Sequence, residues 1–130
     1  MTVTLSAHDA YELWAETYPP VAHNPLMRVE QEVVEPLLAH IRPRRALDVG
    51  SGSGRYLPVL QAAGASVVIG VDFSLAMLRR AAAGPSTELG AGHGRVCGDA
   101  CRLPFTRGAF DLINASLMVG DVADLGRWSR

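Results

Sequence analysis

The sequence predicts an α/β fold: a doubly wound, mostly parallel sheet of about four strands, preceded by N-terminal helices. Three observations support this class. After residue 45, short apolar segments alternate with segments of helical length. The helical segments begin at N-cap residues and end at glycines. The first apolar segment runs directly into a glycine-rich turn, which is typical of a strand-to-helix connection in a parallel sheet.

Residues 1–44 are predicted to form a helical cap on the remainder of the domain. Ser6, followed three residues later by Asp9, fits the start of a short first helix. Asn24 and Pro25 supply the N-cap and the first-turn proline of a second helix, whose apolar residues recur at helical spacing. Pro36 lies inside this pattern and is expected to kink the second helix or to split it in two.

Residues 45–130 are predicted to form the core of strands and crossover helices. The expected strands are Ala46–Val49, Ser66–Val71, Gly94–Cys97 and Phe110–Ala115. The expected helices are Ser53–Ala63, ended by Gly64, then Leu75–Ala83, capped by Ser74, and a last one from about Asp121. Right-handed crossovers are expected to place helices on both faces of the sheet.

The composition excludes several classes of function. Apolar residues make up 48% of the 130 residues, which suffices for a core, and no apolar run reaches the length of a membrane span. All twelve basic side chains are arginines, so a lysine Schiff base or a phosphate-loop lysine is excluded. The net charge of −1 predicts no nucleic-acid or membrane partner. Two cysteines are too few for a disulfide scaffold, so we expect a cytoplasmic protein.

The stretch from Asp48 to Gly54 has the pattern D-x-G-x-G-x-G at the end of the first predicted strand. Glycine tolerates positive φ and lets a ligand lie against the backbone, and the N–H groups of a helix starting near Ser53 would favour a negative group. A tight turn without a ligand is the alternative. The spacing does not fit G-x-G-x-x-G, because the third glycine would fall on Arg55 or Leu57. The dinucleotide and phosphate-loop hypotheses are therefore weakened.

Two acids follow the next two predicted strands. Asp72 can accept hydrogen bonds from both hydroxyls of a ribose, and the adjacent Phe73 can lie along an adenine face. The alternative is that Asp72 only caps the helix that starts at Ser74. Asp99 can accept a hydrogen bond from an exocyclic amine, or it can simply form a turn beside Gly98.

Four motifs follow one another in a characteristic order between Ala46 and Val122. They are Leu47–Gly54, Val71–Ser74, Gly98–Ala100 with Leu103–Phe105, and Phe110–Ile113. Together they resemble class I S-adenosylmethionine-dependent methyltransferases, most of all the small-molecule subgroup with ubiquinone-type and malonyl-carrier-protein-type enzymes. The segment Tyr11–Tyr18 is similar to the Y-D-x-x-A-x-x-Y opening of that subgroup, with Glu12 in place of the aspartate.

The resemblance implies a Rossmann-like fold that binds S-adenosyl-L-methionine and transfers its methyl group to a small-molecule or carrier-bound acceptor. It places the methionine part of the cofactor on the glycine turn, with Asp48 near the amino group, Asp72 on the ribose and Phe73 near the adenine. The implied cofactor-binding residues are Tyr11, Tyr18, Asp48, Gly50, Ser51, Gly52, Gly54, Asp72, Phe73, Asp99, Ala100 and Asn114.

The remaining roles also come from the resemblance. Asp99 and Ala100 would hold the adenine edge, and Asn114 would face the sulfonium through its backbone carbonyl. Tyr11 and Tyr18 would close the site from the front.

The chemistry requires few catalytic groups. A methyl group on a sulfonium is already activated, and orientation can supply roughly 7–11 kcal/mol of the barrier. A general base is needed only for a poorly ionised acceptor, and His23 and Tyr18 are the candidates. Cys97 and Cys101 do not have zinc-site spacing, so we expect no metal, and we expect Cys97 to be a buried residue at a strand end.

The fourth predicted strand is apolar on both sides, so it should not be a sheet edge. The chain therefore resembles the front part of a larger domain, or a protomer that covers this strand by forming a homodimer or by binding a complementing C-terminal segment. A non-catalytic or truncated cofactor-binding module, acting as a scaffold or subunit, is the alternative to an active methyltransferase. A nicotinamide oxidoreductase is disfavoured by the glycine spacing.

Overall fold

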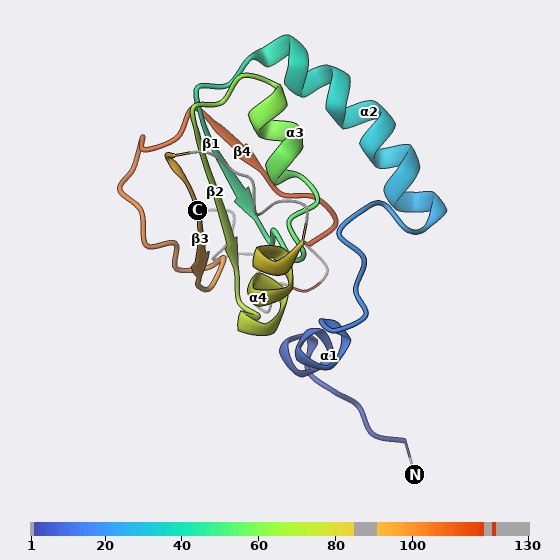
Figure 1. Ribbon diagram of the computed structural model, residues 1–130. Helices are drawn as coiled ribbons and strands as arrows, with labels where there is room; N and C mark the ends of the chain where they lie inside the picture. Colours follow the sequence, from blue (N-terminus) through green and yellow to red (C-terminus); the bar gives the residue numbers. More distant parts are fainter. Residues whose placement is uncertain (1, 85–90, 119–120, 122–130) are drawn as a thin grey trace.

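The computed structural model describes residues 2–84, 91–118 and 121. The elements in this part are α1 (Ala7–Trp14), α2 (Pro25–Ile41), β1 (Arg45–Val49), α3 (Leu57–Ala62), β2 (Val67–Asp72), α4 (Leu75–Ala83), β3 (His93–Cys97) and β4 (Leu112–Asn114). The four strands form one parallel sheet in the order β3-β2-β1-β4 (Figure 1). The predicted α/β class is therefore confirmed.

Three helices begin at the residues that the sequence predicts as N-caps. The side chains of Ser6, Asn24 and Ser74 each accept a hydrogen bond from the backbone N–H three residues later, at 3.1, 2.9 and 3.2 Å. Each of these bonds satisfies one of the free N–H groups of the first helical turn. The predicted starts of α1, α2 and α4 are confirmed.

Two helix predictions differ from the structure. α3 begins at Leu57 and not at Ser53, because Gly52 and Gly54 have φ values of +54° and +86°, which an α-helix does not allow. The expected split at Pro36 does not occur, and α2 is one helix of 17 residues. Pro36 is exposed, so the carbonyl group that loses its helical donor there can be hydrated. The helix predicted from about Asp121 lies outside the described residues.

Each face of the sheet is covered by a separate apolar cluster. On one face, Leu38 of α2 and Leu57 and Leu60 of α3 pack against Ala46 and Val68. On the other face, the connection between β3 and β4 covers the sheet without a helix (Figure 1). Its apolar side chains are Ala100, Leu103, Phe105 and Phe110. In the described residues, helices therefore cover one face, because this connection is a series of turns.

β4 is an edge strand in the described part of the sheet. It pairs only with β1, and the side chain of Ile113 is 60% exposed. The expectation that the fourth strand is not an edge is therefore not met within the described residues. Just before β4, the carboxylate of Asp111 accepts hydrogen bonds from the backbone N–H groups of Arg44 and Arg45 at 2.9–3.2 Å, at the start of β1.

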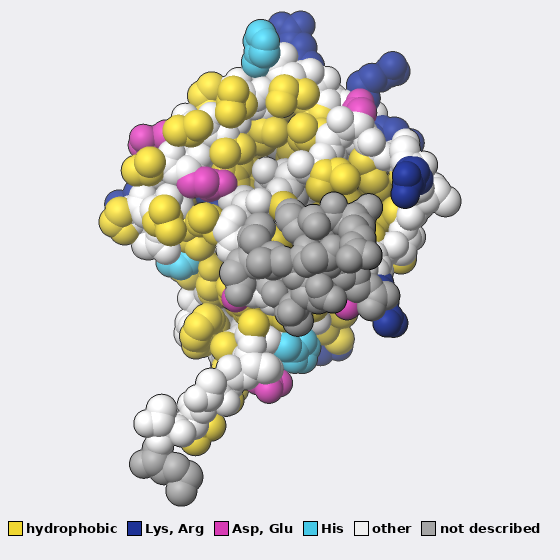
Figure 2. Space-filling view, turned by 180° about the vertical axis from the view of Figure 1, so that it is seen from behind, with side chains coloured by type: hydrophobic (Ala, Val, Ile, Leu, Met, Phe, Trp, Pro, Cys, Tyr) yellow, Lys and Arg dark blue, Asp and Glu magenta, His cyan; other side chains and the backbone are white. Residues whose placement is uncertain are grey.

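α2 exposes a line of apolar residues that nothing in the described structure covers. We call this line the α2 apolar face, and it consists of Leu26, Val29, Val33, Leu37 and Ile41. Figure 2 shows hydrophobic side chains gathered on the side of the molecule where α2 lies. Large aliphatic side chains in contact with water favour association with a second apolar surface. Among the described residues, no helix has the length and hydropathy to cross a membrane.

Gly70 of β2 is required by its contact with the glycine turn. A Cβ atom at this position would lie 2.8 Å from Ser51 Oγ and 3.1 Å from Leu57 Cδ2. We predict that Gly70→Ala lowers the free energy of unfolding by about 1–3 kcal/mol, as overpacking does in other cores. Chemical denaturation measures this loss. Adding Ser51→Gly should recover part of it, whereas independent effects of the two substitutions would contradict the proposed contact.

Candidate functional site

A cavity of about 290 Å³ opens where the carboxyl ends of all four strands meet. Its lining includes a residue within two positions of the end of each strand: Gly50 after β1, Phe73 after β2, Asp99 after β3 and Ser116 after β4. Carboxyl ends of parallel strands are the usual ligand-binding edge of an open α/β sheet. All the cofactor-binding residues predicted from the sequence line this cavity except Gly54 and Asn114.

The glycine turn after β1 forms the floor of the cavity. The backbone N–H groups of Gly50 and Ser51 both donate to the carbonyl of Val71, at 2.8 and 3.1 Å, which ties the turn to β2. Gly50 has a φ of +71°, and a Cβ atom there would lie 2.7 Å from Met118 Cβ. Glycine is therefore required at this position, both by the backbone conformation and by close packing.

Asp72 joins the glycine turn to α4. Its side chain accepts hydrogen bonds from Gly52 N at 2.8 Å and from Ser74 N at 2.9 Å. The residue is only 8% exposed, and burial raises the pKa of its carboxyl group, while these two backbone donors oppose the rise. The capping role that the sequence left open is therefore present. Asp72 also lines the cavity.

Asp48 is a buried carboxyl group beneath the glycine turn. It is 3% exposed, and burial raises its pKa to about 7, although a hydrogen bond from Asn114 and the charge of Arg55 act in the opposite direction. Asn114 Nδ2 donates to Asp48 Oδ1 at 2.9 Å. The side chain of Asn114 thus contacts Asp48, and Asn114 does not line the cavity.

The front of the cavity is closed by aromatic residues from the N-terminal segment. The ring of Tyr11 lies 6.2 Å from that of Tyr18 and 6.1 Å from that of Phe73, centroid to centroid. The Tyr11 hydroxyl donates to Asp121 Oδ2 at 2.9 Å, and burial together with this carboxylate raises the pKa of Tyr11. Tyr11 and Tyr18, which were predicted to close the site, both line the cavity.

Glu12 holds α1 in place, although α1 has no buried residue. Its Oε1 accepts hydrogen bonds from Ser74 Oγ at 2.8 Å and from Ala76 N at 3.3 Å, at the start of α4. These donors lower the pKa of Glu12. The glutamate that replaces the aspartate of the opening motif therefore docks α1 on the helix that follows Asp72.

The loop after β3 places Asp99 and Ala100 at the cavity. Asp99 Oδ1 accepts a hydrogen bond from Cys101 N at 2.8 Å, so the turn-forming role that the sequence left open is present. Gly98 N donates to the Asp72 carbonyl at 2.9 Å and holds the loop against β2. Asp99 itself is exposed.

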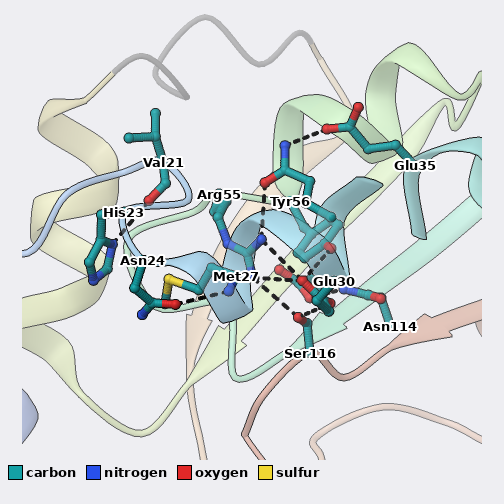
Figure 3. A network of polar contacts seen from close by, with 12 residues as sticks. Val21, His23, Asn24, Met27, Glu30, Glu35, Arg55, Tyr56, Asn114 and Ser116 are labelled. Carbon is teal, nitrogen blue, oxygen red and sulfur yellow. Dashed lines mark hydrogen bonds and ion pairs between the residues drawn. The ribbon is translucent and has the colours of Figure 1, made fainter. Parts of the chain in front are cut away.

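The sequence analysis missed a polar cluster beside the cavity, centred on Glu30 of α2 (Figure 3). Arg55 donates to Glu30 Oε2 from both Nη1 and Nη2 at 3.2 Å, and to Gln31 Oε1 at 3.0 Å. Tyr56 donates to Glu30 Oε2 at 2.8 Å, and Ser116 donates to the other carboxylate oxygen. Arg55, Tyr56 and Ser116 line the cavity, whereas Glu30 lies behind them.

A signal for this cluster was present in the sequence. Glu30 occurs in the same helical pattern as Met27, Val34 and Leu38, whose side chains face the interior. A carboxylate on the inner face of an amphipathic helix requires a partner, because an unpaired buried charge is costly. The sequence does not identify the partner, because Arg55 lies 25 residues further along the chain, beyond the glycine turn.

The two candidates for a general base are His23 and Tyr18. His23 is exposed and does not line the cavity. Its ring packs edge-on against Tyr18 with a centroid distance of 4.9 Å, and its Nδ1 lies 3.1 Å from the carbonyl oxygen of Val21. Tyr18 lines the cavity, and burial raises the pKa of its hydroxyl group.

The described residues contain no group of three or more histidine, cysteine or acidic side chains that could hold a metal ion. The prediction that Cys97 is buried is wrong, because this residue is exposed at the end of β3. β3 is an edge strand whose residues are only partly covered.

The parallel sheet, the glycine turn and the acid after the adjacent strand define the Rossmann-like class of nucleotide-binding α/β domains. Comparison with known families makes the assignment specific. Residues 47–129 match the family described as "Methyltransferase domain", and the chain belongs to this family of class I S-adenosylmethionine-dependent methyltransferases. The family suggested by the four sequence motifs is thus confirmed.

Two curated relatives and one solved structure illustrate the similarity. The chain is 37% identical to demethylmenaquinone methyltransferase of Roseiflexus sp. over 82 residues, which are 62% of this chain and 33% of the relative. It is 30% identical to malonyl-[acyl-carrier protein] O-methyltransferase of Legionella pneumophila, over 97% of this chain and 44% of the relative. The S-adenosylmethionine-dependent methyltransferase of Mesorhizobium loti superposes with a TM-score of 0.58 at 31% identity, over 72% of this chain and 43% of that one.

The chain therefore spans less than half the length of each of the curated relatives described here.

Proposed function

We propose that this domain binds S-adenosyl-L-methionine and takes part in methyl transfer to a small-molecule or carrier-bound acceptor. The observation that carries the proposal is the single cavity that brings together the glycine turn, Asp72 and the Asp99 loop at adjoining strand ends. Membership of the methyltransferase-domain family supports it. The core of residues 45–130 would hold the cofactor, and the cap of residues 1–44 would close the front of the site.

The residues around the cavity match the parts of the cofactor. The backbone at Gly50 and Gly52 leaves room for the methionine part, and Asp48 beneath it can receive the ammonium group. Asp72 can accept from a ribose hydroxyl with lone pairs that its two backbone donors leave free. Phe73 offers an apolar surface to the adenine. Gly54 and Asn114 would act indirectly, since neither lines the cavity.

Methyl transfer requires mainly that the protein orient the acceptor atom toward the methyl group. When bound, the cofactor supplies a methyl group that is already activated by its sulfonium. The residues of this chain have to hold an acceptor atom in line with that group and keep water out, and Tyr11, Tyr18 and Met118 are placed to do so at the mouth of the cavity. Tyr18 retains its proton at neutral pH, because burial raises the pKa of its hydroxyl group, so Tyr18 serves as a hydrogen-bond donor and not as a general base.

The second candidate function is a non-catalytic cofactor-binding module. The observation in its favour is that the chain corresponds to only 33% and 44% of the two curated relatives. Both functions require the cofactor, so a binding experiment tests what they share, and an assay of turnover distinguishes them. A cytoplasmic location remains a prediction.

Calorimetric titration with S-adenosylhomocysteine tests the proposal. We expect Asp72→Ala to lose measurable binding, because the substitution removes the ribose acceptor and loosens the glycine turn. The matched control is Asp111→Ala, which also removes a carboxylate bonded to two backbone N–H groups, but at the far end of β1. Asp111→Ala should retain binding. Wild-type binding of a nicotinamide dinucleotide in place of S-adenosylhomocysteine would contradict both candidate functions.

We further infer that β4 and the α2 apolar face are covered in the functional protein, either by a second copy or by a complementing C-terminal segment. An open apolar strand edge is a template for pairing. For the isolated chain we expect self-association at tens of micromolar in sedimentation velocity experiments. A single monomeric species at this concentration would contradict coverage by a second copy.

A further inference from the structure

The Glu30 cluster neutralises the single basic side chain at the cavity. Among the described lining residues, Arg55 is the only lysine, arginine or histidine. Its guanidinium and the Glu30 carboxylate are 12% and 19% exposed, so water screens their interaction weakly. The Arg55 guanidinium also lies over the Tyr56 ring, with Cζ 4.5 Å from the centroid. The positive charge is therefore fixed in place and already compensated.

Two hydrogen-bond donors at this end of the cavity remain free. Arg55 donates hydrogen bonds to described residues through Nη1 and Nη2. Its Nε–H donates to no residue in the part of the chain that the structure describes. The Tyr18 hydroxyl likewise has no hydrogen-bond partner in the part of the chain that the structure describes. The positive charge of Arg55 opposes the rise in the pKa of the Tyr18 hydroxyl group, which agrees with the two residues lining the same cavity.

The described lining of the cavity also includes apolar side chains and four acidic residues. Val21, Met27 and Met118 line the same cavity. The acidic residues that line the cavity are Asp48 beneath the turn, Asp72 and Asp99 after β2 and β3, and Asp121 at Tyr11. A carboxylate that entered beside Arg55 would be repelled by Glu30, and Arg55 would offer it no unpaired positive charge. An ammonium group would be repelled by Arg55, and the Glu30 carboxylate would already be paired.

We propose that Arg55 and Tyr18 bind the methyl acceptor through an oxygen atom, and that Glu30, by neutralising Arg55, restricts the acceptor to uncharged molecules with an apolar body. This inference rests on the proposed function, since it assigns the acceptor side of the same cavity. Arg55 and Tyr18 contact the acceptor, whereas Glu30 is a positioning residue that acts through Arg55.

Three probes with one apolar body and different charges test the charge rule. They are 4-propylphenol, 4-propylbenzoate and 4-propylbenzylammonium, each titrated at pH 7 into the full chain saturated with S-adenosylhomocysteine. We expect the phenol to bind about tenfold more tightly than either charged probe, because each charged probe would lose hydration without gaining an unpaired counter-ion. Arg55→Met should weaken binding of the phenol about tenfold, and Tyr18→Phe should weaken it severalfold. Tighter binding of either charged probe by the wild type would overturn the proposal.

Glu30→Gln gives a result that a purely structural role would not produce. The substitution leaves Arg55 uncompensated, so 4-propylbenzoate should gain about tenfold in affinity while the phenol gains nothing. Glu32→Gln, an equal change of charge at an exposed position of the same helix, is the control and should change no affinity. An equal loss for all three probes in Glu30→Gln would show that Glu30 only supports the fold and would overturn the proposal.

The proposed function and this inference fail in different ways. Absence of S-adenosylhomocysteine binding in the first titration would contradict the proposed function alone. The three probes would then be titrated into the chain without S-adenosylhomocysteine, where the same order of affinities is expected because the Glu30 cluster is held by residues of the chain itself.

Discussion

Gly50→Ala is expected to weaken binding of S-adenosylhomocysteine about 10- to 100-fold. The new methyl group would meet Met118 Cβ at 2.7 Å and Cγ at 2.9 Å, and alanine would have to adopt a φ of +71°. The floor of the cavity would then move, or Met118 would be pushed into the space of the ligand. Calorimetric titration measures the loss of affinity, and chemical denaturation measures the accompanying loss of stability.

Gly108→Ala is the matched control for this prediction. Gly108 has a similar φ of +78°, but a Cβ atom there has no neighbour within 4 Å, and the residue does not line the cavity. The control should therefore lose about 1 kcal/mol of stability through backbone strain and retain its affinity. Equal losses of affinity in the two variants would show that general destabilisation explains the effect. The close approach of Gly50 to the ligand would then not be its cause.

Affinity for S-adenosylhomocysteine is expected to rise with pH up to about 7 and then to level off. In the unliganded protein burial raises the pKa of Asp48 to about 7, so the group is largely protonated in mild acid. The ammonium group of the ligand favours the carboxylate, so binding in this range releases a proton. One released proton corresponds to about a tenfold gain in affinity per pH unit. Titrations between pH 5.5 and 8 measure the slope.

Asp48→Asn should remove most of this slope, because asparagine does not titrate. A slope that is unchanged in Asp48→Asn would contradict the assignment of Asp48 to the ammonium group.

The same raised pKa has a consequence for stability with the opposite sign. Between the unfolded pKa of 3.8 and the folded value of about 7, the folded protein binds the extra proton. The contribution of Asp48 to the free energy of unfolding therefore falls as the pH rises through this range, by an amount on the order of a few kcal/mol. Asp111, whose pKa is lowered by backbone donors, contributes stability that is lost only as the pH falls below its usual value.

The fold could be predicted from the sequence because its signals are local. Ser6, Asn24 and Ser74 each cap a helix with their own side chain, so three residues of sequence suffice to find each start. The start of α3 was missed because the pattern does not specify the positive φ values of Gly52 and Gly54. The connection between β3 and β4 was expected to allow a helix on the second face, but apolar turns cover that face.

The site could be predicted where it lies at strand ends, and Tyr11 and Tyr18 could be predicted from the opening motif. Asp72 and Asp99 were found because an acid after a strand has a known position at the ligand-binding edge. Glu30 and Arg55 were missed because the partners are 25 residues apart and meet only after α2 packs on the sheet. Asn114 was expected to face the sulfonium through its backbone carbonyl; the pairing of its side chain with the buried Asp48 joins distant residues that no local pattern specifies.

The order of the strands also sets the order in which the two halves of the site can form. Arg44 and Ser66, at the starts of β1 and β2, are 22 residues apart, whereas Asp48 and Asn114, paired between β1 and β4, are 66 apart. Closing the longer loop costs more chain entropy. During synthesis on the ribosome, the glycine turn and Asp72 would therefore come together early. The part of the cavity that Ser116 lines would form only after β4 is synthesised.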